Sequence, residues 1–153
     1  MATMNSVMSV LKVGRRVRND DLKLRPGRNL IRGQSGRAYD FEAHPFETPG
    51  DLADVSAVYI YARDFTSAEA HARGHDAGAE DFSFIYAGEA ADVAQRHRET
   101  LAQGALSGFD VNVALLVCVD NPAIRAEIVE DIVALHRPVL NDLLRSQHGR
   151  LRG

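Results

Sequence analysis

Apolar residues along the chain gather into short runs, separated by polar segments that contain glycine and proline. Val55–Ala62 and Phe82–Ala87 are rich in β-branched and aromatic residues, which predicts two strands. Val111–Val119 is almost entirely apolar, as expected for a strand that is buried on both faces. These three runs predict a small antiparallel sheet of three strands, with Val111–Val119 as its most buried strand.

Helical spacing is found between and after these runs. Asp92–Gln103 has apolar residues one turn apart, which predicts an amphipathic helix. Asn121 followed by Pro122 is typical of a helix start, and Pro138 ends the helix that follows. Leu140–Ser146 is expected to form a short last helix. The predicted buried face of the long helix consists of apolar residues at helical spacing: Ile124, Ile128, Ile132 and Leu135, widened by Val129 and Val133.

These elements predict one α/β (α+β) domain in the order β-β-α-β-α-α, with helices flanking the sheet. The domain is expected to span residues 38–146, with residues 39–46 packing on it as a lead-in. Residues 64–81 are expected to be an insertion, and residues 147–153 a polar tail. Residues 1–37 show little periodicity and contain several glycines and one proline, Pro26, which predicts an irregular N-terminal arm.

Charge separates the arm from the rest of the chain. Residues 1–37 carry nine Lys/Arg and two Asp/Glu, whereas residues 38–153 carry nine and 19. We expect arginines of the arm, Arg15, Arg16 and Arg18 among them, to contact phosphate groups of a nucleic acid. A disordered solubilising tail is the alternative interpretation, and an acidic domain by itself would repel DNA.

Composition limits the setting. The apolar fraction of 45% is ordinary for a soluble globular domain, and no apolar run approaches the length of a membrane span. The N-terminus lacks the apolar core of a secretory signal and only loosely resembles an organelle transit peptide. A single cysteine, Cys118, excludes an internal disulfide and is expected to pack in the core. We therefore expect a cytoplasmic protein that does not bind membranes.

A set of residues spread over the predicted elements forms a recognisable order. Tyr59 lies in the first strand, and Tyr86-Ala87-Gly88 ends the second. Arg96 follows ten residues after Tyr86, and Asn141 comes three residues after Pro138. In this order and on this pattern of elements, the chain resembles the GIY-YIG endonuclease family over residues 57–141.

The resemblance implies a three-stranded α/β domain and a chemistry, the hydrolysis of phosphodiester bonds in DNA. Tyr59 and Tyr86 would face a shared cleft, where one of them deprotonates a water molecule directly or through a relay. Arg96 would contact the phosphate, a glutamate would hold Mg²⁺ or Mn²⁺, and Asn141 would close the site. Gly88 and Thr100 match positions beside the substrate.

The chain departs from the family pattern at several positions. Val129 occupies the place of the metal-binding glutamate. Glu130 is rotated from it by about 100° around the helix and Glu127 by about 160°, so Glu130, and less well Glu127, remain the candidate ligands. Thr100 stands where a tyrosine or histidine is common, and Glu89 stands where DNA-repair members carry lysine.

Each motif residue also has an ordinary structural interpretation. The tyrosines could be half-buried strand residues, Arg96 a solvated arginine, Asn141 a helix cap, and Gly88 a turn residue. Glu127 and Glu130 could belong to a solvated helix face. A possible metal pair, His71 and His75, is interrupted by glycine and is expected to lie in an exposed loop.

The sequence thus supports two hypotheses. The first is a metal-dependent endonuclease that acts on DNA. The second is a module with the same fold and a degraded site that binds nucleic acid or a protein partner.

Overall fold

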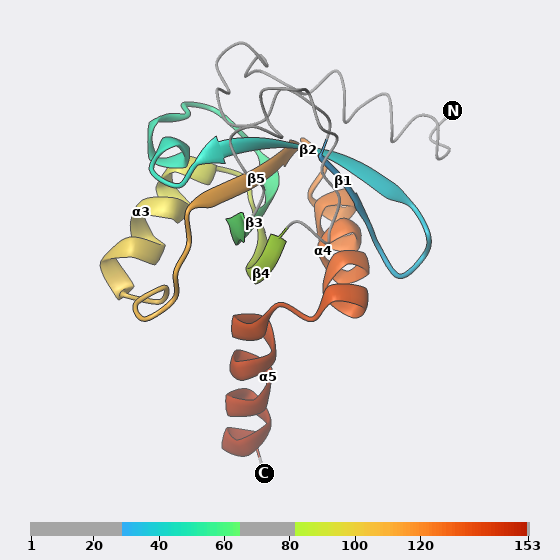
Figure 1. Cartoon of the computed structure of the whole chain (residues 1–153), viewed down its shortest axis with the longest axis vertical. Coiled ribbons are helices and arrows are strands. Elements are labelled where there is room, and N and C mark those ends of the chain that lie inside the picture. The colour runs from blue at the N-terminus through green and yellow to red at the C-terminus, as the bar shows by residue number, and fades with distance from the viewer. Residues whose placement is uncertain (1–28, 65–81, 153) are drawn as a thin grey trace.

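The computed structural model describes residues 29–64 and 82–152. Within these residues, one antiparallel sheet has the strand order β1-β2-β5-β3-β4 (Figure 1). Its strands are Asn29–Arg32 (β1), Ala38–Pro45 (β2), Ala57–Asp64 (β3), Phe82–Ala90 (β4) and Val113–Cys118 (β5). The prediction of a mixed α+β fold is confirmed, and β5, fully buried, lies in the centre of the sheet. The prediction of a three-stranded sheet is wrong, because β1 and β2 extend it to five strands.

The two additional strands form a hairpin that is tied to the rest of the domain. Asp131 on the helix Pro122–His136 (α4) accepts hydrogen bonds from the backbone N–H of Ser35 at 2.8 Å and from its hydroxyl at 2.7 Å. The hydroxyl of Tyr39 donates to the same carboxylate at 2.8 Å. Residues 29–37 are therefore part of the domain, and the irregular arm predicted to reach residue 37 ends no later than residue 28.

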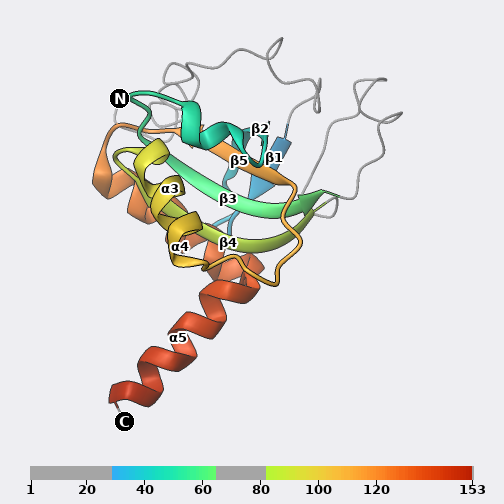
Figure 2. The same cartoon turned by 90° about the vertical axis from the view of Figure 1, so that its left-hand side faces the viewer.

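Helix α4 begins after Asn121, the predicted capping residue, and α3 (Val93–Gln103) begins within one residue of the start predicted from its apolar spacing. The side chain of Asp92 accepts from the N–H of Gln95, and that of Asn121 accepts from the N–H of Ala123 and Ile124. Helix α5 (Val139–Arg152) continues past the predicted end at Ser146, so that residues 147–152 are helical rather than a separate tail. In both views α5 extends away from the sheet (Figures 1 and 2). A 3₁₀ helix, η2 (Thr48–Asp51), follows β2.

The sheet separates two hydrophobic clusters. On one face, Val58 and Ile60 of β3 pack with Ile128 and Ile132 of α4. On the other face, Tyr59 and Tyr61 of β3 pack in a second cluster together with residues of α3. Figure 2 shows α3 and α4 on either side of the curved strands. Successive side chains of a strand point to opposite faces of the sheet. The motif tyrosines therefore lie on the opposite face of the sheet from α4.

No helix among the described residues is long and apolar enough to cross a membrane.

His44 on β2 makes stability depend on pH. Its side chain is 1% exposed, and its Nδ1 atom has no hydrogen-bond partner among the described residues. Burial lowers its pKa from 6.5 to about 4. The unfolded chain therefore binds a proton below pH 6.5 that the folded protein does not bind until about pH 4, which favours unfolding between these values.

We expect the free energy of unfolding to fall by up to about 3 kcal/mol between pH 6.5 and pH 4 because of this one group. Urea unfolding of the wild type and of His44→Leu across this range measures the effect. The pH dependence of the free energy of unfolding should be smaller in the variant by the equivalent of about one proton. Asp131 adds a slope of the same sign in both proteins, since its hydrogen bonds lower its pKa. Identical slopes for the two proteins would contradict the assignment.

Candidate active site

Tyr59 and Tyr86 lie side by side on the face of the sheet that α3 covers. In the antiparallel pair β3–β4, Tyr59 is opposite Gly88 and Tyr61 is opposite Tyr86, so that these side chains share a face. The ring centroids of Tyr59 and Tyr86 are 6.1 Å apart, and Tyr61 lies 5.2 Å from Tyr59. Two tyrosines that are distant in sequence are thereby brought to one place.

A β-bulge in this pair decides which way Tyr86 faces. Tyr61 is opposite Tyr86 and Ala62 is opposite Phe84, which leaves Ile85 as the extra residue of β4. An extra residue reverses the alternation of side chains along a strand. Phe84 therefore packs on the α4 side, against His136 at 4.9 Å, whereas Ile85 and Tyr86 both belong to the cluster on the α3 side.

Gly88 provides the space that the two rings need. A Cβ atom at this position would lie 2.7 Å from the hydroxyl oxygen of Tyr59 and 2.9 Å from Cε2 of Tyr86. Real Cβ atoms do not approach other atoms so closely, so that any side chain here would displace one or both rings. Gly88 thus acts through the placement of Tyr59 and Tyr86, which is more than the permissive turn considered from the sequence.

Arg96 projects from the second turn of α3 toward these rings. Its Nη1 donates a hydrogen bond to the carbonyl oxygen of Glu89 at 3.4 Å, and its side chain lines the same pocket as that of Tyr59. Its Nε lies 3.7 Å from Oε1 of Glu99, one turn further along the helix, and the Arg96 side chain is 47% exposed. The arginine is therefore oriented by the site and still open to an anionic ligand.

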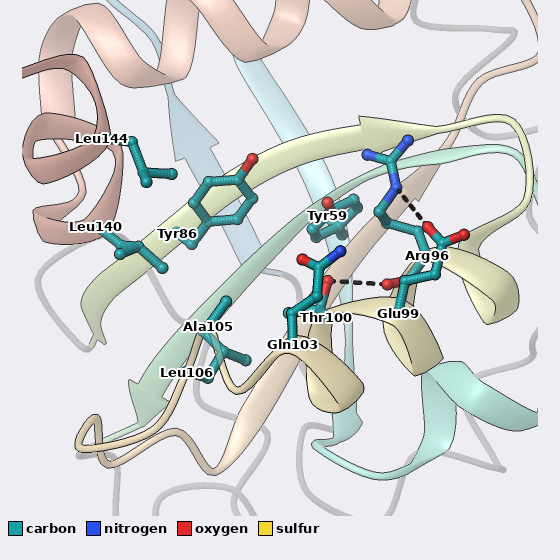
Figure 3. Close-up of a pocket in the computed structure, with 10 residues that line it drawn as sticks. All are labelled: Tyr59, Tyr86, Arg96, Glu99, Thr100, Gln103, Ala105, Leu106, Leu140 and Leu144. Atoms are coloured by element: carbon teal, nitrogen blue, oxygen red, sulfur yellow. Dashed lines mark hydrogen bonds and ion pairs between the residues drawn. The ribbon is translucent and has the colours of Figure 1, made fainter. Parts of the chain in front are cut away.

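These groups line a pocket of about 390 Å³ (Figure 3). Its walls come from β3, β4, α3, the segment after α3 and α5. The lining residues are Tyr59, Tyr86, Arg96, Glu99, Thr100, Gln103, Ala105, Leu106, Leu140 and Leu144. The hydroxyl of Thr100 donates to the carbonyl of Arg96 at 2.8 Å, which holds this residue at the wall of the pocket. Thr100 brings no titratable group to the site. Four residues expected from the motifs thus converge on one pocket: Tyr59, Tyr86, Arg96 and Thr100.

Burial holds Tyr59 in its protonated form. It raises the pKa of Tyr59 from 10.0 to about 12, and the positive charge of Arg96 only partly opposes this shift. Burial raises the pKa of Tyr61 as well. The Tyr59 hydroxyl is therefore protonated at neutral pH and can donate a hydrogen bond or pass on a proton, but it is a poor direct base.

His97 is buried next to the tyrosines and contacts Tyr61. It is 2% exposed, and its Nδ1 lies 2.7 Å from the hydroxyl of Tyr61. Phe46 packs edge-on against both of these rings. The position of His97, one turn after the buried Val93, is consistent with its burial, but no sequence pattern indicates the hydrogen bond to Tyr61.

Asn141 forms hydrogen bonds with the edge strand of the sheet. From the first turn of α5, its amide oxygen accepts from the N–H of Ala87 at 2.8 Å, and its amide nitrogen donates to the carbonyl of Ala87 at 3.0 Å. β4 is an edge strand, and this pair of bonds satisfies backbone groups that a further strand would otherwise pair. Asn141 therefore fixes α5 beside Tyr86, and its side chain does not cap the helix.

Glu127 and Glu130 are not brought to the tyrosines. Both line a shallow depression with Ser35, Tyr39 and Asp131, at the junction of α4 with the β1–β2 hairpin. Val129, at the position where the resemblance would require a glutamate, packs against the core on the α4 side. The two predicted metal ligands thus lie around a different pocket from Arg96, because α4 covers the opposite face of the sheet.

Two other carboxylates lie near the tyrosine pocket. Glu99 lines it and accepts a hydrogen bond from Gln95 at 3.2 Å. Glu89 is held by Arg125 of α4, whose Nε donates to its carboxylate at 2.7 Å. Glu89 is therefore paired with Arg125 and does not line the pocket. Glu99, which lies beside Arg96, is the half-exposed carboxylate of the pocket that a divalent cation could reach. No group of three or more His, Cys, Asp or Glu residues within 29–64 and 82–152 is arranged to hold a metal ion.

The remaining candidates, Arg15, Arg16, Arg18 and the pair His71 and His75, lie outside the described residues.

A scan against protein-family models and searches of curated proteins and of solved structures found no match to this chain.

Proposed function

We propose that this chain is a divalent-metal-dependent endonuclease of the GIY-YIG type that hydrolyses phosphodiester bonds in DNA. One observation carries the proposal: Arg96, Tyr59 and Tyr86, which are distant in sequence, line the same pocket. An arginine fork and two hydroxyl groups directed to one place suit a phosphate group and the water that attacks it. The order of the motifs along the chain supports the same assignment.

The residues divide the work as follows. Arg96 binds the scissile phosphate and stabilises the negative charge that develops on it. The protonated Tyr59 hydroxyl orients the phosphate or the attacking water, and Tyr86 relays a proton: its oxygen accepts the proton of that water as its own hydroxyl proton passes to solvent or to the leaving oxygen. Gly88 and His97 keep the tyrosine rings in place.

Mg²⁺ or Mn²⁺, when bound, supplies neutralisation of phosphate charge and activation of water. Magnesium sites with phosphate ligands often use only one or two protein carboxylates. Glu99 meets this requirement, because it lines the pocket and its side chain is 50% exposed. We therefore assign the metal to Glu99 in place of Glu127 and Glu130.

A degraded module that binds nucleic acid or a protein without cutting is the second candidate. It is favoured by the placement of Val129 in the core and of Glu127 and Glu130 around a separate depression. The two candidates differ in one result, since only the nuclease converts supercoiled plasmid to the nicked form.

We expect the full chain to nick supercoiled plasmid in Mg²⁺ or Mn²⁺ and not in EDTA. Glu99→Gln should reduce the initial rate about tenfold at limiting metal, since it removes the carboxylate that holds the cation. Glu130→Gln is the matched control on α4 and should keep the wild-type rate. Loss of activity in Glu130→Gln alone would show that the metal ligand is on α4 and not Glu99. Absence of nicking by the wild type in either metal would favour the second candidate, the degraded module.

A further inference from the structure

We infer that the tyrosine pocket holds one unpaired nucleotide, so that the preferred substrate is DNA with single-stranded character at the site of cleavage. This inference rests on the proposed function and specifies its substrate class. It is carried by the chemical asymmetry of the pocket and by the distribution of charge around it.

The pocket has an apolar end and a charged end. Figure 3 shows Leu140 and Leu144 of α5 on one side, Arg96 on the other, and the rings of Tyr86 and Tyr59 between them. A nucleotide has the same asymmetry, with a flat apolar base at one end and a phosphate at the other. Base stacking on an aromatic ring and phosphate pairing with arginine are the usual means by which proteins hold single strands.

The apolar end has no task in phosphate hydrolysis alone. Leu144 is 40% exposed, although it lines the pocket, and leucine side chains do not stabilise a phosphate. Their exposure is explained when a base covers them. Thr100 and Gln103, on the α3 wall, offer hydrogen-bonding groups to the edge of that base.

A base can lie between Tyr86 and the leucines only when it is unstacked. In an intact duplex the faces of each base are covered by its neighbours, and extrusion costs a few kcal/mol. Single strands, loops and flaps avoid this cost. The volume of about 390 Å³ falls in the range of small-molecule sites, which suits one nucleotide rather than a double helix.

Charge favours the same substrate. Residues 29–153 carry 11 Lys/Arg against 19 Asp/Glu, so this part of the chain repels the high charge density of a duplex. A single strand has a lower charge density and needs fewer compensating cations. Arg96 can neutralise one phosphate locally, while the bases add affinity that does not depend on charge.

The test is a binding measurement in EDTA, which prevents metal-dependent cleavage. Fluorescence anisotropy of the full chain with a labelled 12-nucleotide oligothymidine and with a 12-base-pair duplex, at one fixed salt concentration, gives the preference. We expect the single strand to bind at least fivefold more tightly. The seven Lys/Arg of residues 1–28 are present in every measurement. Their contribution to binding is therefore the same in the wild type and in each variant.

Two leucines one residue apart provide matched variants. Leu144→Ser should weaken single-strand binding about fivefold, because it removes the apolar surface against the base. Leu143→Ser changes the same residue type at 47% exposure outside the pocket lining and should leave binding unchanged. Tyr86→Leu should weaken binding about tenfold through the loss of base stacking. Thermal melting confirms that each variant is folded.

Equal affinity for the duplex, or equal losses in Leu144→Ser and Leu143→Ser, would overturn the inference. Its failure is distinguishable from failure of the proposed function. Metal-dependent nicking without a single-strand preference would remove only the inference. A selective single-strand preference that depends on Leu144, with no cleavage in any metal, would remove only the nuclease.

Discussion

Replacing Arg125 with alanine should lower the free energy of unfolding by about 3 to 4 kcal/mol. The guanidinium is 5% exposed, and its Nε donates to Glu89 on β4 at 2.7 Å. Its Nη1 donates to the carbonyls of Val119 and Asp120, at 3.0 and 2.8 Å, in the segment that leads from β5 into α4. The substitution breaks the ion pair, leaves two carbonyls without this donor and opens a cavity under the helix.

Urea unfolding at pH 7 measures this loss, and two further variants identify its source. Arg125→Met preserves most of the volume but not the donors, so it should recover only the part of the loss that is due to packing. Arg63→Ala removes a surface ion pair with Asp110, whose two side chains are 38% and 80% exposed, and should cost less than about 1 kcal/mol. A similar fall in the free energy of unfolding in Arg63→Ala and Arg125→Ala would show that the buried ion pair contributes no more to stability than the exposed one.

Replacing Arg96 with alanine should reduce the rate of plasmid nicking by about 10² to 10³-fold without unfolding the protein. The side chain is half exposed and stands over the pocket, so its removal opens no core cavity. Under the proposed function, what is lost is the positive charge that binds the phosphate. The measurement is the initial rate at saturating metal, with the melting temperature as a check of folding.

Arg98, two residues further along α3, is the matched control. It donates to the carbonyl of Gly50 at 3.0 Å and does not line the pocket. Arg98→Ala should therefore keep most of the activity. Arg96→Lys should be intermediate, because lysine keeps the charge but lacks the planar fork. Equal activity in Arg96→Ala and Arg98→Ala would rule out Arg96 as the phosphate-binding group.

Local signals located most of the elements correctly. Asp92 and Asn121 mark the starts of α3 and α4 because a capping side chain satisfies backbone N–H groups within a few residues of itself. The apolar run 111–119 predicted the central strand, since complete burial demands a continuous apolar sequence. Pro138 separated α4 from α5. Each of these signals acts over one or two turns of chain.

The elements that were missed depend on partners distant in sequence. β1 is only four residues long and contains Asn29 and Arg32, so nothing in its sequence marks a strand. It is held by pairing with β2, and the hairpin is held by Asp131, about a hundred residues later in the chain. The end of α5 was placed too early because a polar sequence can remain helical when no residue terminates it.

The site shows the same division. The motif order, from Tyr59 to Asn141, and the elements that carry it could be identified from the sequence, because they follow from local patterns and spacing. How these residues meet became visible only in the folded structure. The bulge in β4 orients Tyr86 toward α3, Gly88 leaves space for both rings, and the packing of α4 on the opposite face removes Glu127 and Glu130 from the pocket. Sheet register and helix placement result from long-range packing, which no single segment of the chain encodes.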